Sequence, residues 1–188
     1  MLKRIPAVTL AVLLLSSLLA IAQAPEMPKP GAEQKNLGFM AGTWNVTGDV
    51  KPGPMGPGGK YTGVEHIDWM PGGYFLVSHT QGSSAMGKET GLAIYGYDPG
   101  KKIYTYDEFN SMGEAVHATG TFDGKVWTWS SDIAVGGGQS MKSQFVLTEV
   151  SPTSYTFKFE VSPDGTNWTT FMDGNGSKVA KEGAAEKK

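Results

Sequence analysis

The sequence has 188 residues, a formal net charge of −2 and no cysteine. The lack of cysteine excludes disulfide bonds, cysteine-based catalysis and thiolate metal sites. A charge this close to neutral indicates no nucleic-acid-binding surface, and the length suits one folded domain behind a leader.

Residues 1–24 have the pattern of a secretory signal peptide. Lys3 and Arg4 precede an almost wholly apolar run, and the Ala-Gln-Ala sequence at 22–24 supplies small residues for cleavage. The apolar run is near the lower limit for spanning a bilayer, so cleavage is favoured over retention as an anchor. The sequence therefore predicts an exported bacterial protein, periplasmic or secreted, with no stable membrane anchor after cleavage.

Residues 25–36 contain proline, lysine and glutamate with little to bury, so they are expected to form a flexible linker. Residues 37–42 are expected to form a short helical or turn-like lid. From Thr43 onward the pattern changes, because Trp44 and Val46 fall on one face and polar residues on the other. Such alternation is typical of a half-buried strand.

Proline and glycine dominate residues 51–59, which predicts a long exposed hairpin loop. Short strand-like runs then alternate with turn sequences rich in glycine, proline, aspartate and asparagine. A Gly/Ser stretch around 82–84 is expected to be a loop, and 179–188 a disordered tail. The predicted strands are 43–50, 61–69, 74–80, 91–97, 103–109, 115–122, 126–132, 140–150, 155–161 and 167–174.

Short sequential strands without a convincing helix between them predict an all-β fold. An antiparallel up-and-down β-barrel of about ten strands over residues 37–178, closed by the N-terminal segment, removes exposed sheet edges. Residues 155–161 have a strictly apolar row, but other strands mix polar and apolar groups, as where Glu65 follows Gly63 and precedes Ile67. A hollow barrel tolerates inward polar groups better than a packed sandwich does. The pattern therefore favours an interior cavity.

Several short motifs occur in a fixed order along the domain. They resemble those of the bacterial domain-of-unknown-function family 1579 and, more distantly, the lipocalin-like (calycin) barrels that include the nitrobindin type. The resemblance covers residues 37–174 and implies a ten-stranded barrel closed by an N-terminal segment, with no assigned activity. The motifs are Leu37-x-Phe39-x-x-Gly42-Thr43-Trp44, the Pro/Gly loop at 52–58, Gly63-x-Glu65, Gly72-Gly73-x-Phe75-Leu76, Gly96-Tyr97-Asp98, Gly120-x-Phe122-Asp123-Gly124 and Trp168-x-x-x-Met172.

The resemblance also bears on cofactors. Nitrobindin-type relatives hold haem through a histidine late in the chain, whereas no histidine follows His117 here. No cofactor is therefore predicted, haem included.

Aromatic and polar residues on the predicted barrel faces are the candidates for ligand binding. An inward Glu65 would have a raised pKa, whereas a rim position would not raise it, and the sequence leaves both open. A hairpin near Gly72 places His79 opposite Glu65 or His66, where a cross-strand polar pair is favoured over a metal or acid–base pair. The candidates are Trp44, Glu65, His66, His79, Tyr104, Tyr106, Trp127 and Trp129.

No phosphate-binding loop, nucleophile elbow or metalloprotease motif is present, so no catalytic residue and no metal ligand is assigned. The favoured function is binding of a small apolar or amphipathic molecule inside the barrel. One alternative is a cell-envelope structural or interaction module without a ligand. A less favoured one is an enzyme, either haem-dependent or using Glu65 with His66 or His79 as acid–base groups.

Overall fold

The computed structural model describes residues 29–53, 56–136 and 138–180. The predicted leader at 1–24 and residues 181–188 of the predicted tail lie outside the described residues. Within the described ranges, no helix is both long enough and apolar enough to cross a membrane.

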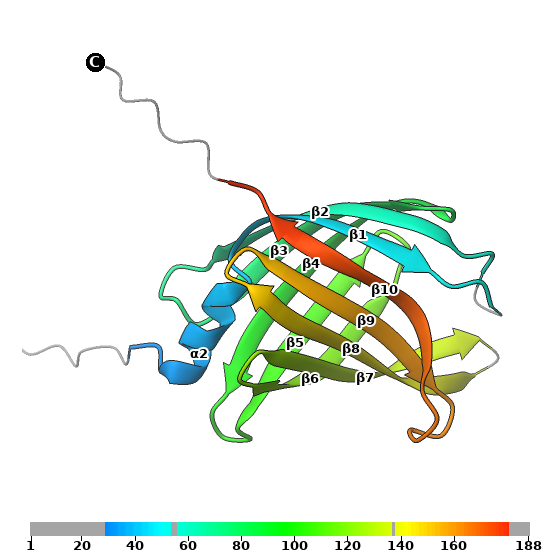
Figure 1. Ribbon diagram of the computed structural model, residues 1–188. Helices are drawn as coiled ribbons and strands as arrows, with labels where there is room; N and C mark the ends of the chain where they lie inside the picture. Colours follow the sequence, from blue (N-terminus) through cyan, green and yellow to red (C-terminus); the bar gives the residue numbers. More distant parts are fainter. Residues whose placement is uncertain (1–28, 54–55, 137, 181–188) are drawn as a thin grey trace, which may run out of the picture.

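Ten antiparallel strands form a closed barrel in which each strand pairs with its neighbours in sequence (Figure 1). Strand β1 pairs with β10 to complete the closure. The predicted all-β, up-and-down barrel of ten strands is confirmed. The strands are β1 (Gly42–Val50), β2 (Gly59–Trp69), β3 (Leu76–Ser84), β4 (Gly87–Asp98), β5 (Ile103–Asn110), β6 (Ala115–Asp123), β7 (Val126–Gly136), β8 (Gln139–Ser151), β9 (Ser154–Ser162) and β10 (Thr169–Lys178).

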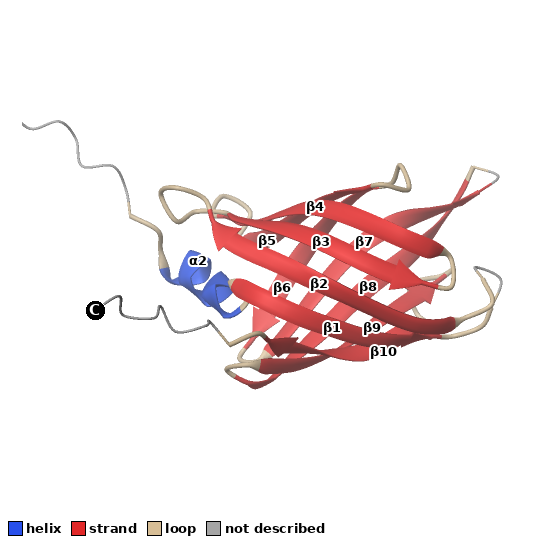
Figure 2. Cartoon of the chain, turned by 90° about the horizontal axis from the view of Figure 1, so that it is seen from above, coloured by secondary structure: helices blue, strands red, loops and turns tan. Residues whose placement is uncertain are grey.

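Two short helices precede the barrel and lie across one of its mouths (Figure 2). They are α2 (Ala32–Asn36) and the 3-10 helix η1 (Leu37–Phe39). Leu37 is fully buried, and the indole Nε1 of Trp44 donates a 2.8 Å hydrogen bond to the carbonyl oxygen of Met40. The predicted N-terminal closure is therefore confirmed. It begins earlier than expected, because residues 32–36 of the expected linker are helical.

Most of the observed strands run longer than predicted, by up to four residues at one end, and two of the differences in β3 have an identifiable cause. Residues 82–84 continue β3 instead of forming a loop, because Gly82 pairs with Gly63 and the Tyr61 hydroxyl covers both glycines. Residues 74–75 belong to the β2–β3 turn instead of β3, and the ring of Phe75 lies against Gly96. In both places the packing of an aromatic ring over a glycine outweighs the secondary structure that the local sequence favours.

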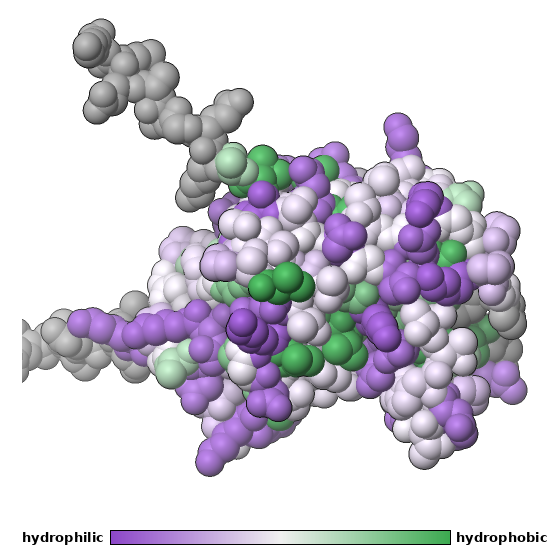
Figure 3. Space-filling view, in the orientation of Figure 1, coloured by the Kyte–Doolittle hydropathy of each residue, from purple (hydrophilic) through white to green (hydrophobic). Residues whose placement is uncertain are grey.

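The visible outer face is mostly polar or neutral, with small apolar patches between the polar groups (Figure 3). Such a surface suits strands that present one face to water and the other to an interior. The candidate functional site is therefore sought on the inner wall of the barrel.

Candidate functional site

The pairing register decides which side chains face the interior. Trp44 lies opposite Glu65, and Glu65 lies opposite Thr80, so all three point to the same side of the sheet. Trp44 is buried beneath the N-terminal segment, which identifies this side as the inner one. Alternation along each strand then assigns the inner and outer positions of the whole barrel.

Six of the eight predicted site residues face the interior, and the pairs Tyr104/Tyr106 and Trp127/Trp129 share that face as expected. The inward ones are Trp44, Glu65, Tyr104, Tyr106, Trp127 and Trp129.

The two predicted histidines face outward. His66 lies directly opposite His79 across β2 and β3, and both are exposed on the outer wall. The Nδ1 atom of His66 lies 3.0 Å from the hydroxyl of Thr43, also on the outside. A histidine next to an inward Glu65 must point the other way, so neither histidine can contact a ligand held inside.

The half of the interior next to α2 is filled by side chains. Trp127 is 0 % exposed, and its ring centroid lies 4.9 Å from that of Tyr104. Trp44 is 1 % exposed and lies 4.9 Å from Tyr155, centroid to centroid. The indole Nε1 of Trp127 donates a 2.8 Å hydrogen bond to Glu149. Trp44, Tyr104 and Trp127 therefore form the core of the barrel and do not line free space.

Glycines on the inner wall let large rings lie flat against it. A Cβ atom at Gly120 would lie 2.5 Å from the indole ring of Trp129, and one at Gly174 would lie 2.7 Å from the ring of Phe157. Neither contact is possible with a side chain larger than hydrogen, so each ring covers the backbone of its glycine.

From the middle of the barrel to the mouth opposite α2, the inner wall keeps accessible surface. Glu65, Tyr95 and Tyr106 lie deep inside the protein, and yet each is only half-buried. Groups at this depth can be accessible only if space adjoins them. We call this region the open half; its half-buried inner residues are Tyr61, Glu65, Thr80, Glu89, Tyr95, Tyr106, Glu108, Phe145 and Phe159.

Two of the carboxyl groups in the open half are hydrogen-bonded to tyrosines. The Tyr106 hydroxyl donates to Glu108, and the Tyr61 hydroxyl donates to Glu89. Burial raises the pKa of Glu108, and the bond from Tyr106 partly opposes that rise. Burial also raises the pKa of Tyr61, so its phenol stays protonated and remains a donor.

Glu65 differs from these two, because no hydrogen bond to its carboxyl group occurs within the described part of the chain. Burial, followed by the charge of Glu108, raises the pKa of Glu65 from 4.5 to about 7. The carboxyl is therefore much harder to ionise than an ordinary glutamate. Its oxygens keep accessible surface, because among the described residues no buried side-chain oxygen or nitrogen atom lacks a hydrogen-bond partner. An accessible carboxyl this deep in the wall, with no protein donor, marks a place where a ligand can bind.

Positive charge is scarce on the inner wall. Among the described strand residues, Lys178 is the one basic side chain on the inner face, opposite Trp44. It lies at the α2 end, where its Nζ donates a 3.0 Å hydrogen bond to the carbonyl oxygen of Phe39. Across the described ranges, no three His, Asp or Glu side chains are grouped so that they could hold a metal ion.

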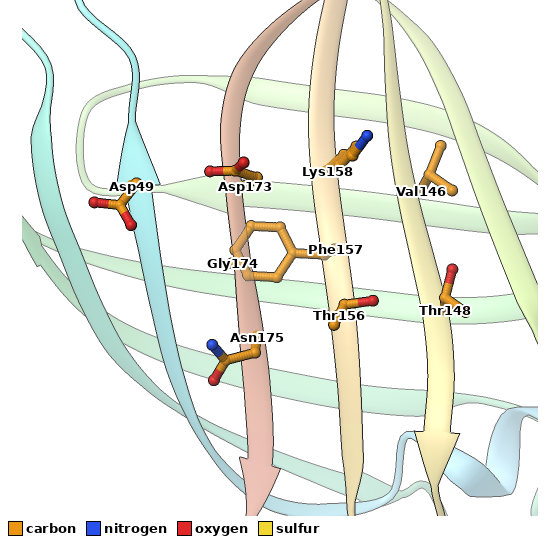
Figure 4. Close-up of a pocket in the computed structure, with 9 residues that line it drawn as sticks. All are labelled: Asp49, Val146, Thr148, Thr156, Phe157, Lys158, Asp173, Gly174 and Asn175. Atoms are coloured by element: carbon orange, nitrogen blue, oxygen red, sulfur yellow. The ribbon is translucent and has the colours of Figure 1, made fainter.

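The outer wall carries two open grooves. The larger, of about 590 Å³, crosses β1, β8, β9 and β10, and Asp49, Asp173 and Asn175 project into it (Figure 4). Asp173 already forms an ion pair with Lys51 at 2.6 Å, and Asp49 forms one with Lys60 at 2.6 Å. The second groove, of about 390 Å³, lies over β3, β4 and β5. Both grooves are shallow and open to solvent, unlike the enclosed form that is usual for small-molecule sites.

The sequence analysis missed seven of the residues named for the open half, which are Tyr61, Thr80, Glu89, Tyr95, Glu108, Phe145 and Phe159. Glu108 could have been found by counting alternate positions from Tyr104 and Tyr106 along the same strand. Glu89 had no such signal, because its strand was expected to begin at residue 91.

Comparison with known proteins identifies the fold and the family. No curated protein matches the sequence. The "Crystal Structure of Rv2717c from M. tuberculosis" is similar at a TM-score of 0.55 and 12% identity, covering 80% of this chain and 99% of that one. The "Structure of EF1p2_mFAP2b bound to DFHBI" has a TM-score of 0.43 and 15% identity, covering 78% of this chain and 98% of that one.

At 12% identity, the likeness to the first of these structures shows the fold alone. The sequence itself matches a family model over residues 29–178. The chain belongs to the family described as "Protein of unknown function (DUF1579)", as the motif pattern predicted.

Proposed function

We propose that this protein binds a small apolar or amphipathic organic molecule inside the open half of its barrel. The observation that carries the proposal is the accessible surface that Glu65, Tyr95 and Tyr106 keep deep inside the wall. An enclosed apolar space with a few polar groups is the usual form of a small-molecule site. A structural module without a ligand would not need this space, because a filled barrel is more stable.

The width of the barrel supports the same proposal. Eight strands give an interior that side chains can just fill, and ten strands give a wider one. At the α2 end the N-terminal segment, Trp44 of β1 and Trp127 of β7 fill the extra width. In the open half, the inner wall combines small residues such as Gly91 and Ala93 with rings that lie flat.

The proposal predicts that blocking the interior abolishes binding, whereas the same change outside does not. Thr80 faces the open half, and Thr119 is exposed on the outer face of β6. We expect the neutral fluorophore 1-N-phenylnaphthylamine to bind saturably. Thr80→Trp should weaken its affinity about tenfold or more by occupying the space, and Thr119→Trp should leave it unchanged. The measurement is a fluorescence titration of the three folded proteins.

Equal binding by the wild type and both variants would contradict the proposal, because the fluorophore would then sit outside the barrel. Failure of the wild-type protein to bind it would contradict the proposal as well.

A further inference from the structure

Among the described residues of the open half, the Glu65 carboxyl group is accessible and accepts no hydrogen bond from a protein atom. It faces the interior from the middle of β2, opposite Trp44 and Thr80. The other inner carboxyls of this region, Glu89 and Glu108, each accept a hydrogen bond from a tyrosine. The Glu65 carboxyl group therefore faces the interior as a hydrogen-bond acceptor, and a ligand with a hydrogen-bond donor can bind to it.

The groups that face Glu65 add negative charge and no positive charge. Glu108 faces it from β5, and Tyr61 lies along its own strand. Tyr95 on β4 and Tyr106 on β5 are also close enough to interact with its charge, as is Tyr155 on β9. The neighbours on β1 and β3 are Trp44 and Thr80, which do not titrate. An anion placed here would meet repulsion from every ionised neighbour.

An aromatic wall stands beside these carboxyls. The ring centroids of Tyr95 and Tyr106 lie 4.8 Å apart, and that of Trp129 lies 5.6 Å from Tyr95 and 5.8 Å from Tyr106. The negative faces of such rings attract cations, most strongly where water is excluded. A carboxylate next to clustered rings is an arrangement that favours an ammonium group with an apolar body.

We propose that the ligand of the open half is an organic ammonium compound, whose charged nitrogen lies between Glu65 and the Tyr95–Tyr106–Trp129 wall. This inference rests on the proposed function and adds the charge of the ligand to it. A bare metal ion fits less well, because the described residues offer no group of three acidic or histidine ligands.

Proton release follows from the same geometry. In the free protein the pKa of Glu65 is raised to about 7 by burial and by Glu108. A bound cation favours the ionised carboxylate and so lowers that pKa. Binding near neutral pH therefore releases protons, and affinity for the cation falls as the pH drops and Glu65 becomes protonated.

The test compares three probes of matched shape by isothermal titration calorimetry at pH 8. They are 4-phenylbutylamine, 4-phenylbutan-1-ol and 4-phenylbutyrate, which carry a positive charge, no charge and a negative charge. We expect the amine to bind about tenfold tighter than the alcohol, and the carboxylate to bind most weakly. Glu65→Gln should lower the amine affinity about tenfold and leave the alcohol affinity within about twofold.

Asp68→Asn is the matched control, because Asp68 is exposed on the outer face of the same strand. It should change the affinity for none of the three probes. The wild-type protein supplies a readout that needs no variant: at pH 7, amine binding in two buffers of different ionisation enthalpy should reveal proton release, and alcohol binding should not.

Alcohol binding as tight as amine binding, or amine binding without proton release, would overturn the charge assignment and leave the proposed function intact. The same conclusion follows if none of the three probes binds while 1-N-phenylnaphthylamine does. If that fluorophore also fails to bind, both the charge assignment and the proposed function are overturned.

Discussion

At Glu65, burial and a neighbouring carboxyl act in the same direction. Both oppose ionisation, so the folded protein holds this proton up to about pH 7, whereas an unfolded chain releases it near 4.5. The stability contributed by the neutral carboxyl is therefore fully present below pH 4.5 and is lost as the pH rises through about 7. In the free protein, ionisation of Glu65 therefore lowers the free energy of unfolding, and a bound ligand can offset that loss.

Replacing this carboxyl with an amide should stabilise the empty protein at alkaline pH. We expect Glu65→Gln to raise the free energy of unfolding by on the order of 2 kcal/mol at pH 8.5, with the gain shrinking as the pH falls towards 4.5. The measurement is urea unfolding at both pH values, with Asp68→Asn as the exposed control. A gain that is the same at both pH values would show that Glu65 is not held neutral by burial.

The sequence marked Glu65 as unusual, because a carboxylate interrupts a row of apolar and small residues. It could not tell which face of the sheet that row occupies, since β2 carries apolar groups on both sides. The pairing of Glu65 with Trp44 shows which face is the inner one, and that register is set by the whole β1–β2 hairpin. The same register places His66 and His79 opposite each other on the outside, which is one of the two cross-strand pairings that a hairpin near Gly72 predicted.

At the scale of the elements, alternation and turn chemistry were enough to predict ten strands and their order. The two errors in β3 fall where an aromatic ring lies over a glycine of a neighbouring strand. Gly82 breaks the alternation of β3 in the sequence, but in the structure it makes room for the ring of Tyr61. Such pairs join residues about twenty positions apart, so a local pattern cannot reveal them.

The N-terminal segment acts as an element of the barrel and not as a separate arm. Leu37 is fully buried at the closed mouth, and Asn36 donates a 3.1 Å hydrogen bond to the Tyr104 hydroxyl. This segment fixes which half of the barrel is filled, and so which half can accept a ligand.

Removing the buried side chain of this segment should loosen the closed end. We expect Leu37→Ala to lower the free energy of unfolding by about 3 kcal/mol through lost burial and the cavity left behind. Glu33→Ala, on the exposed side of α2, should cost little. Chemical denaturation of both variants checks the difference, and a Leu37→Ala protein as stable as the wild type would show that the segment does not pack on the barrel.

At the scale of the whole molecule, the barrel has a filled half and an open half. Closure was predictable, because sequential short strands without covering helices leave no other way to remove sheet edges. The open half was favoured by the mixed strand faces, but its extent was not predictable. It depends on rings such as Trp129 and Phe157 lying over glycines of other strands instead of pointing to the axis.

The account depends most on where a small molecule sits, and solution NMR can measure that directly with 1-N-phenylnaphthylamine bound to the wild-type protein. Intermolecular nuclear Overhauser effects should connect the fluorophore to the rings of Tyr95 and Tyr106 on the inner wall. They should be absent at Leu92 and Phe109, which line the outer groove over β3 to β5. Contacts to Leu92 and Phe109, with none to Tyr95 and Tyr106, would contradict a ligand site inside the barrel.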